Sequence, residues 1–176
     1  MRRTAKTVNF GVIYGMSPFG VSEALSIPHE EAKRYIERYF ERHHGVKQYI
    51  EAAISEARQK GYTVTLAGRR RPIPEIRSQN SNTRAQAERL AVNSPIQGSA
   101  ADIIKIAMIN IREKLKEEHL TARMLLQVHD ELLLEVPESE INAAADILKK
   151  EMEGAVKLLV PLRVDIGSGR NWAEAH

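Results

Sequence analysis

The sequence predicts an α+β fold in which several helices precede a small, mainly antiparallel sheet. Helical periodicity dominates residues 2–60 and 82–118. Short runs of β-branched and apolar residues at 62–66 and 124–136 are typical of strands joined by tight turns. Because the strands do not alternate regularly with helices, an antiparallel sheet is expected rather than a parallel one.

Residues 1–60 are predicted to form four helices separated by short breaks. Met16-Ser17-Pro18 interrupts the first, because proline cannot donate a backbone hydrogen bond. Ser26-Ile27-Pro28 predicts a helix start, with Ser26 as an N-cap type of residue and Glu30 and Glu31 near the positive end of the helix dipole. The expected helices span about residues 2–15, 19–25, 28–43 and 46–60.

A hairpin and a long helix are predicted next. Residues 62–66 have strand-like composition, Gly68 supplies a turn, and residues 71–74 return as an exposed edge. A helix is then expected over about residues 82–118, with a kink at Pro95. Beyond the kink, apolar residues at helical spacing form a core-facing stripe, namely Ile104, Met108, Ile111 and Leu115.

The last third of the chain is predicted to form a second hairpin, a helix and a final strand. Apolar strands at 124–128 and 131–136 are joined through His129-Asp130. Residues 137–140 open a helix whose apolar side carries Ile141, Ala145, Leu148 and Met152. The run from Leu162 to Ile166 is expected to be the last strand.

Composition narrows the class of protein. The chain has no cysteine, which excludes disulfides and thiolate metal sites and fits a reducing cytoplasm. No segment approaches the roughly 20 apolar residues of a membrane span, and residues 1–20 lack the apolar run of a signal peptide. Lys and Arg outnumber Asp and Glu in residues 1–90, and the balance reverses in residues 91–176. This asymmetry indicates a polyanion-binding surface beside a cation-binding one, or an unevenly charged solvated surface.

A first set of candidate residues lies on the opening helix. Arg2, Lys6, Phe10 and Tyr14 are four residues apart and share one stripe of the helix. Two cations near the positive end of a helix are unfavourable unless an anion binds there. Lys and Arg can bind phosphate oxygens, and the rings can stack on a base or sugar. Gly11 in the helix interior indicates close packing. An ordinary amphipathic helix with basic ends is the alternative.

A second set lies in the predicted turn of the C-terminal hairpin, Gln127-Val128-His129-Asp130-Glu131. The adjacent carboxylates of Asp130 and Glu131 repel each other, and a divalent cation relieves that repulsion. Mg²⁺ prefers carboxylate oxygens together with substrate phosphates. A polar tight turn without a metal is the alternative, because Asp is common in turns.

A third set is the polar face of the long helix before Pro95. Gln86, Arg89, Asn93 and Gln97 are spaced by three and four residues and lie on one side. Such side chains suit the minor-groove acceptors that all base pairs share, so they test pair geometry without reading sequence. An exposed polar helix face is the alternative.

These residues carry a resemblance to the family-A DNA polymerases of the bacterial DNA polymerase I type. Residues 1–15 match the pattern R-x-x-x-K-x-x-x-F-G-x-x-Y-G of motif B, and residues 127–131 resemble motif C. Residues 89–98 are similar to the segment that contacts primer and template. Weaker matches at 65–72 and 167–172 extend the resemblance over nearly the whole chain.

The resemblance implies a role for each residue of motif B. Arg2 and Lys6 would hold the triphosphate of the incoming nucleotide, with Lys6 also taking part in catalysis. Phe10 would lie against the sugar and base, and Tyr14 near the templating position. Phenylalanine rather than tyrosine at position 10 implies discrimination against sugars that lack a 3′-hydroxyl.

The resemblance also assigns roles around motif C and the long helix. Asp130 would bind the catalytic Mg²⁺ ions, Glu131 would support the site as a second catalytic residue, and His129 would lie near the primer terminus. The arginines at 69–71 would bond carbonyl groups of the fold, with DNA phosphates as the alternative. The implied DNA-binding residues are Arg84, Arg89, Asn93, Gln97 and His129.

The implied organisation is a partial fingers subdomain over residues 1–78 and a partial palm over residues 79–176. The expected partners are primer–template DNA, dNTPs and an N-terminal polymerase portion, in DNA replication and repair, in the bacterial cytoplasm at the nucleoid or encoded by a phage. The family's motif A, D-Y-S-x-I-E, does not occur in the sequence. Asp130 and Glu131 would therefore supply one side of a two-metal site, so the chain alone is expected to be inactive. An edge of the 124–136 hairpin would be left unpaired, which invites aggregation or a partner.

Two other functions compete with this interpretation. A non-catalytic DNA-binding module would keep the minor-groove face and perform no chemistry. A family-A RNA polymerase of the phage or mitochondrial type would share motifs B and C in altered form. The sequence Q-V-H-D-E and the pair Phe10 and Tyr14 fit the DNA enzymes better.

Overall fold

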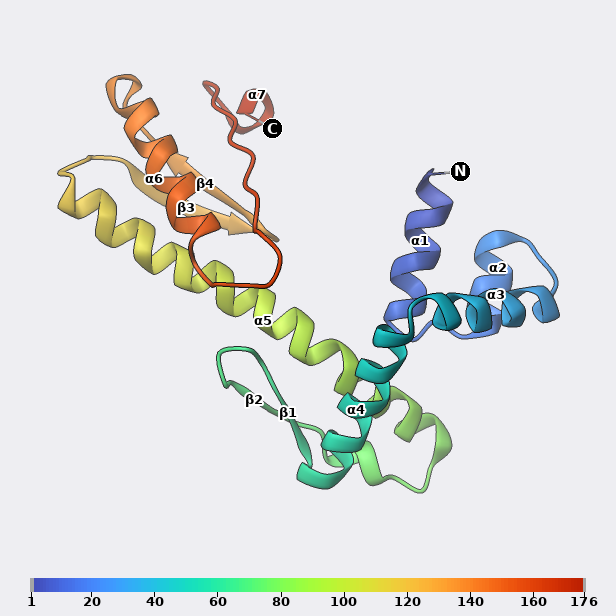
Figure 1. Cartoon of the computed structure of the whole chain (residues 1–176). Coiled ribbons are helices and arrows are strands. Elements are labelled where there is room, and N and C mark those ends of the chain that lie inside the picture. Colours follow the sequence, from blue (N-terminus) through green and yellow to red (C-terminus); the bar gives the residue numbers. More distant parts are fainter. Residues whose placement is uncertain (1, 176) are drawn as a thin grey trace. The chain divides into compact units, whose positions relative to one another are not determined.

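The computed structural model describes residues 2–175, with the side chains of residues 2–5 and 7 outside the described part. The chain divides into two compact units, Met1–Ser99 and Ala100–His176. Each unit combines helices with one antiparallel two-stranded hairpin, β1–β2 in the first unit and β3–β4 in the second (Figure 1). The predicted α+β class is confirmed. The predicted fingers and palm subdomains, divided at residues 78 and 79, stay a prediction.

The helices and strands follow the predicted order closely. The α-helices are α1 Arg2–Ile13, α2 Pro18–Leu25, α3 His29–Arg42, α4 His44–Lys60, α5 Ser81–Glu117, α6 Ile141–Glu153 and α7 Trp172–Ala175. The strands are β1 Tyr62–Val64, β2 Arg70–Pro72, β3 Arg123–Val128 and β4 Glu131–Glu135, with short 3₁₀ helices η1 Pro74–Arg77 and η2 Glu138–Glu140. None of the helices in the described part of the chain combines the length and apolar character needed to cross a membrane.

Serine and proline residues set the boundaries of α2 and α3. Ser17 caps α2, because its hydroxyl accepts a hydrogen bond from the Gly20 amide at 3.3 Å, and Pro18 occupies the first helical position. α2 ends at Ser26, which adopts a left-handed φ of 53°. The prediction that Ser26 caps the next helix is therefore wrong. Ser26 closes the preceding helix by donating its amide to the Glu23 carbonyl, and α3 begins without a side-chain cap.

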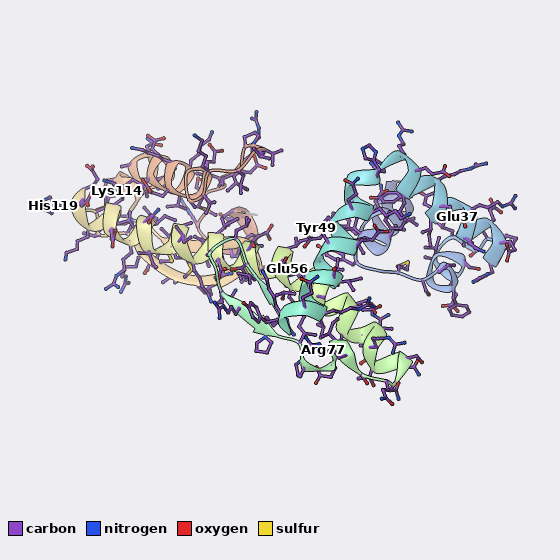
Figure 2. The ribbon with its side chains drawn as sticks, turned by 60° about the horizontal axis from the view of Figure 1, so that its bottom comes forward. Glu37, Tyr49, Glu56, Arg77, Lys114 and His119 are labelled. Atoms are coloured by element: carbon purple, nitrogen blue, oxygen red, sulfur yellow. The ribbon has the colours of Figure 1, made fainter. Side chains whose placement is uncertain are left out.

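The first unit is built on two apolar clusters. One joins α1, α2 and α3 and contains Val8, Val12, Val21 and Ala32; the other joins α4, η1 and α5 and contains Ala57, Ile73, Ile76, Ala87 and Ala91. Hydrogen bonds between elements support the second cluster. The Tyr49 hydroxyl donates to the Val92 carbonyl at 3.0 Å, and the Arg77 guanidinium donates to the Arg58 carbonyl at 2.7 Å (Figure 2). These bonds connect α4 to α5 and the 3₁₀ helix η1 to the end of α4.

The first hairpin follows α4 directly. Gly61 ends that helix with a left-handed φ of 77°, and β1 then pairs antiparallel with β2, so that Tyr62 lies opposite Pro72. Gly68 supplies the turn, again with a positive φ, of 83°. The predicted hairpin is confirmed, and Arg70 covers it by placing its guanidinium 4.9 Å from the centroid of the Tyr62 ring.

The second unit packs the last part of α5 and α6 around the second hairpin. Its buried residues are Ala107, Ile111, Leu115 and Ala144, and half-buried side chains such as Met124, Leu132 and Leu134 pack against them. The predicted stripe on α5 is largely confirmed, since Ile104, Ile111 and Leu115 are buried and Met108 is half-buried. α5 continues without interruption across Pro95.

The predicted last strand at residues 162–166 is wrong. The structure assigns no strand to this segment, and β3 and β4 pair only with each other among the described residues. A strand needs a neighbour to receive its backbone hydrogen bonds. The Val164 amide instead donates to the Glu153 carboxylate at 3.1 Å. The short helix α7, which follows this segment, was not expected from the sequence.

Candidate functional site

One face of α1, continued by Tyr14 directly after the helix ends at Ile13, carries a cation and two rings in sequence. Val8 and Val12 bury the opposite face, which leaves Lys6 exposed and Phe10 half exposed. The Lys6 amino group lies 5.9 Å from the Phe10 ring centroid. Phe10 stacks in turn on Tyr14, with ring centroids 6.4 Å apart and an angle of 14° between the planes. The predicted stripe is therefore one connected surface over Lys6, Phe10 and Tyr14.

Arg2, the other predicted cation of this stripe, lies in α1, but its side chain is outside the described part. No acidic residue occupies the first turn of α1. The positive end of the helix dipole is thus not neutralised by the helix's own sequence, which suits an anionic ligand.

Two glycines allow close packing at the end of this helix. A side chain at Gly11 would place its Cβ 2.5 Å from the Met16 terminal methyl, which accounts for glycine in the helix interior. Gly15 has a φ of 82°, and a Cβ added there would lie 3.2 Å from Cγ of Arg89. Arg89 of the α5 face is therefore next to the end of α1, so two of the predicted sets meet within the first unit.

The predicted DNA-binding face of α5 is partly exposed. Gln86, Arg89 and Gln97 are exposed, whereas Asn93 is half-buried. In the described part of the chain, the Asn93 side-chain oxygen is buried without a hydrogen-bond partner. Arg84 differs from the others, because its guanidinium donates to the Ser78 carbonyl at 2.9 Å and holds the start of α5.

A small basic hollow lies beside Gln97 in the first unit. It is lined by Thr65, Arg69, Arg70, Arg71, Ser94, Gln97 and Gly98. Arg69 has the predicted structural role, donating from its guanidinium to the Gly98 carbonyl at 3.1 Å. Ser94 was not predicted as part of any site. Its hydroxyl is buried without a partner among the described residues, and a serine next to Pro95 in a helix interior was the available sequence signal.

The predicted metal residues lie at the tip of the β3–β4 hairpin. Val128 pairs with Glu131, so His129 and Asp130 form a two-residue turn. His129 adopts a φ of 54°, and its carbonyl accepts a hydrogen bond from the Gln127 side chain at 2.8 Å. This bond fixes the turn that presents Asp130. His129, Asp130 and Glu131 are all exposed.

This turn fits one side of a magnesium site. Mg²⁺ in proteins is commonly held by one or two carboxylates together with water and substrate phosphates. Asp130 and Glu131 supply two neighbouring exposed carboxylates. The described residues contain no cluster of three or more His, Asp or Glu side chains suited to hold a metal without further ligands.

The chain matches one family of proteins along nearly its whole length. The model of the family "DNA polymerase family A" matches residues 1–174. The chain is 55% identical over 175 residues to the DNA polymerase I of Bacillus caldotenax and to that of Bacillus subtilis (strain 168), covering 99% of the chain and 20% of each relative. It is 53% identical over 174 residues to the DNA polymerase I of Lactococcus lactis subsp. cremoris, with the same coverage.

A solved structure of a polymerase domain is similar to the chain in both sequence and fold. The POL domain of Pol1 from M. smegmatis, in a complex with DNA primer-template and dNTP, is 48% identical and superposes with a TM-score of 0.96, covering 99% of this chain and 31% of that one. The chain thus spans about a fifth of the length of its bacterial relatives. The match over residues 1–174, together with these identities, shows that the chain belongs to DNA polymerase family A.

Proposed function

We propose that this chain supplies the nucleotide-binding helix, part of the DNA-binding surface and one metal-binding side of a DNA-directed DNA polymerase. The enzyme adds deoxynucleotides to a primer 3′-end in DNA replication or repair. The single observation that carries the proposal is the surface of Lys6, Phe10 and Tyr14 on α1. Its residues match motif B, and the chain belongs to the corresponding family.

On α1, the positive charges bind the phosphates of the nucleotide, and the aromatic rings contact its sugar and base. Lys6 and Arg2 bind the triphosphate, where charge-assisted hydrogen bonds to phosphate oxygens are about twice as strong as neutral ones. Phe10 lies against the sugar and base, and Tyr14 supports its ring from one helical turn away. The exposed ring of Phe10 offers the apolar contact that a planar base needs.

On α5, the polar face contacts the minor groove of primer and template. Arg89, Asn93 and Gln97 bind the acceptors shared by all base pairs, and Arg84 holds the start of the helix while adding positive charge. The position of Arg89 against Gly15 joins this face to the nucleotide-binding helix. The solved structure of the M. smegmatis relative, a complex with primer-template and dNTP, supports both ligands.

At the hairpin tip, Asp130 holds Mg²⁺, with Glu131 beside it and His129 near the primer terminus. Mg²⁺ held there would supply charge neutralisation at the transferring phosphate. The hydrogen bond from the Gln127 side chain to the His129 carbonyl supports the two-residue turn that carries Asp130. The carboxylates on the other side of the site would come from the N-terminal polymerase portion, so residues 1–176 by themselves are expected to be inactive.

Reconstitution tests this function. The chain is mixed with a polypeptide that carries the thumb and motif A, together with primer–template, dNTPs and Mg²⁺, and primer extension is followed on a gel. Extension by the mixture and by neither component alone is the expected result. Extension by the purified chain alone would contradict the proposed dependence on a partner.

The same assay separates the competing functions. Salt-dependent duplex binding that ignores added nucleotide, without extension in the mixture, would favour a non-catalytic DNA-binding module. Preferential incorporation of ribonucleotides would favour an RNA polymerase. The names of the relatives support the DNA enzyme, and their organisms support a bacterial origin over a phage-encoded one.

A further inference from the structure

Residues 95–99 of α5 are tied to the turn of the first hairpin through one serine. The Leu66 amide donates to the Ser99 hydroxyl at 2.9 Å, and that hydroxyl donates to the Pro95 carbonyl at 2.5 Å. These two hydrogen bonds are called the Ser99 bridge. Ser99 is 94% buried in this contact, with a relative exposure of 6%. Neither Ser99 nor Leu66 belongs to the predicted nucleotide, metal or DNA-binding sets.

The backbone of α5 also lies close to the hairpin turn at the neighbouring residue. A Cβ added at Gly98 would be 2.5 Å from the Thr65 methyl carbon, so only glycine fits between helix and turn. The Thr65 hydroxyl accepts from the Arg69 amide at 3.1 Å, which hinders movement of that side chain. The Arg69 guanidinium then reaches the Gly98 carbonyl at 3.1 Å.

This attachment is needed because Pro95 weakens the helix locally. Proline has no amide hydrogen, so the helix loses the bond that residue 95 would donate to the Ala91 carbonyl. Helices with such a gap bend or rotate unless something else holds them. Gln97 lies between Pro95 and Ser99, and its exposed side chain borders the basic hollow. Its direction is therefore set by how residues 95–99 are held.

We infer that Ser99 is a positioning residue that aims Gln97 at the minor groove of the primer–template duplex. The inference rests on the proposed function of the α5 face. The hairpin turn at residues 65–69 acts through Ser99 and Gly98 and does not touch the base pair itself. Loss of the Ser99 bridge leaves Gln97 present but free to point elsewhere, so the minor-groove contact is lost while phosphate contacts remain.

The test measures one hydrogen bond to the minor groove. Fluorescence anisotropy gives the Kd of the chain for primer–template duplexes that each carry a single 3-deazapurine near the primer terminus, where a C–H replaces the N3 acceptor. At the contacted position, the unmodified chain loses about three- to tenfold in affinity, the worth of one net hydrogen bond. Gln97→Ala removes this difference and identifies the position.

Two variants then act on the attachment from different sides. Ser99→Ala breaks the Ser99 bridge, and Gly98→Ala forces the turn away while raising helix propensity, so it keeps the helix folded if Ser99→Ala does not. Both are expected to bring the effect of 3-deazapurine below about twofold, with weaker protection of the Leu66 amide from hydrogen exchange. Ser99→Thr keeps the hydroxyl and is expected to keep the effect.

The outcomes separate the inference from the proposed function. Full sensitivity to 3-deazapurine in both Ser99→Ala and Gly98→Ala would overturn the positioning role of Ser99 alone. An unchanged exchange rate of the Leu66 amide in Ser99→Ala would also overturn it. Insensitivity of the unmodified chain at every position would overturn the proposed minor-groove function of α5, and the inference with it.

Discussion

At the scale of residues, the surface of α1 combines a positive charge with a stacked pair of aromatic rings. The Lys6 amino group and the Phe10 and Tyr14 rings follow one another along a single helix face. The Lys6 amino group lies over the Phe10 ring, so under the proposed function a phosphate and a base of one nucleotide could be bound side by side. The spacing of four residues was visible in the sequence, because helical geometry alone places such residues on one face.

Charge reversal at Lys6 tests this surface. In the reconstituted enzyme, Lys6→Glu should raise the KM for dNTP by roughly 10- to 100-fold, since a hydrogen bond to a charged group contributes about 1.5–3 kcal/mol. Lys33→Glu on α3 makes the same charge change at another exposed lysine and should leave KM within about twofold. Steady-state primer extension measures both. Equal effects of the two changes would show that only net charge matters.

Tyr49 gives the first unit a dependence on alkaline pH. Partial burial raises the pKa of Tyr49 above its ordinary value of 10.0, because the phenolate would be partly removed from water. The folded state therefore favours the neutral phenol. Its contribution to the free energy of unfolding is complete below pH 10 and is lost as pH rises from there through the raised pKa.

The Tyr49→Phe variant isolates this contribution. It removes the hydrogen bond to the Val92 carbonyl and should lower the free energy of unfolding by about 0.5–1.5 kcal/mol at pH 7. Urea unfolding at a series of pH values should show a smaller decline above pH 10 in the variant than in the unmodified chain. Parallel curves for the two proteins would assign the alkaline decline to other groups, such as lysines.

At the scale of elements, the sequence predicted those units whose boundaries are set by local chemistry. Pro18 begins α2, Gly61 ends α4 and Gly68 turns the first hairpin, and each acts through backbone geometry that is independent of distant contacts. The expected strand at 162–166 failed because a strand depends on a neighbour that local sequence does not specify. The prediction that Ser26 caps α3 was wrong for a related reason. Ser26 lies between two helices, and it caps the end of α2 instead of the start of α3.

The residues of the candidate site also fall into two groups, those predictable from local sequence and those that depend on distant contacts. The α1 stripe and the two-residue turn at Asp130 follow from spacing and could be predicted. The burial of Ser94 and the Ser99 bridge depend on the hairpin turn packing against α5, which is a contact between residues more than 30 positions apart. Periodicity within one helix contains no information about such a contact.

Two isoleucines of α5 provide a matched test of the core of the second unit. Ile111 is fully buried against α6 and the second hairpin, whereas Ile109, two residues earlier, is 58% exposed. Ile111→Ala should lower the free energy of unfolding by about 2–5 kcal/mol, through lost transfer energy and a cavity. Ile109→Ala should change it by less than about 1 kcal/mol. Chemical denaturation followed by circular dichroism distinguishes the two, and similar losses would argue against the core described for this unit.

At the scale of the whole molecule, two compact units carry complementary chemistry. The first unit holds the cationic and aromatic surface of α1 together with the polar face of α5 up to Ser99. The second holds the exposed carboxylates of the β3–β4 turn. Under the proposed function, the basic residues 1–90 would bind phosphates and the acidic residues 91–176 would bind metal, in line with the charge asymmetry of the sequence. The chain spans about a fifth of the length of its bacterial relatives.

The most direct test of this account is the single-turnover rate of nucleotide incorporation by the reconstituted enzyme across a Mg²⁺ titration. Asp130→Ala should lower the rate at saturating dNTP by at least about 1,000-fold, because removal of a metal carboxylate costs several kcal/mol of transition-state stabilisation. Asp146→Ala on α6 removes an equally exposed carboxylate outside the hairpin and should leave the rate unchanged. A normal rate and normal Mg²⁺ dependence in Asp130→Ala would contradict the account.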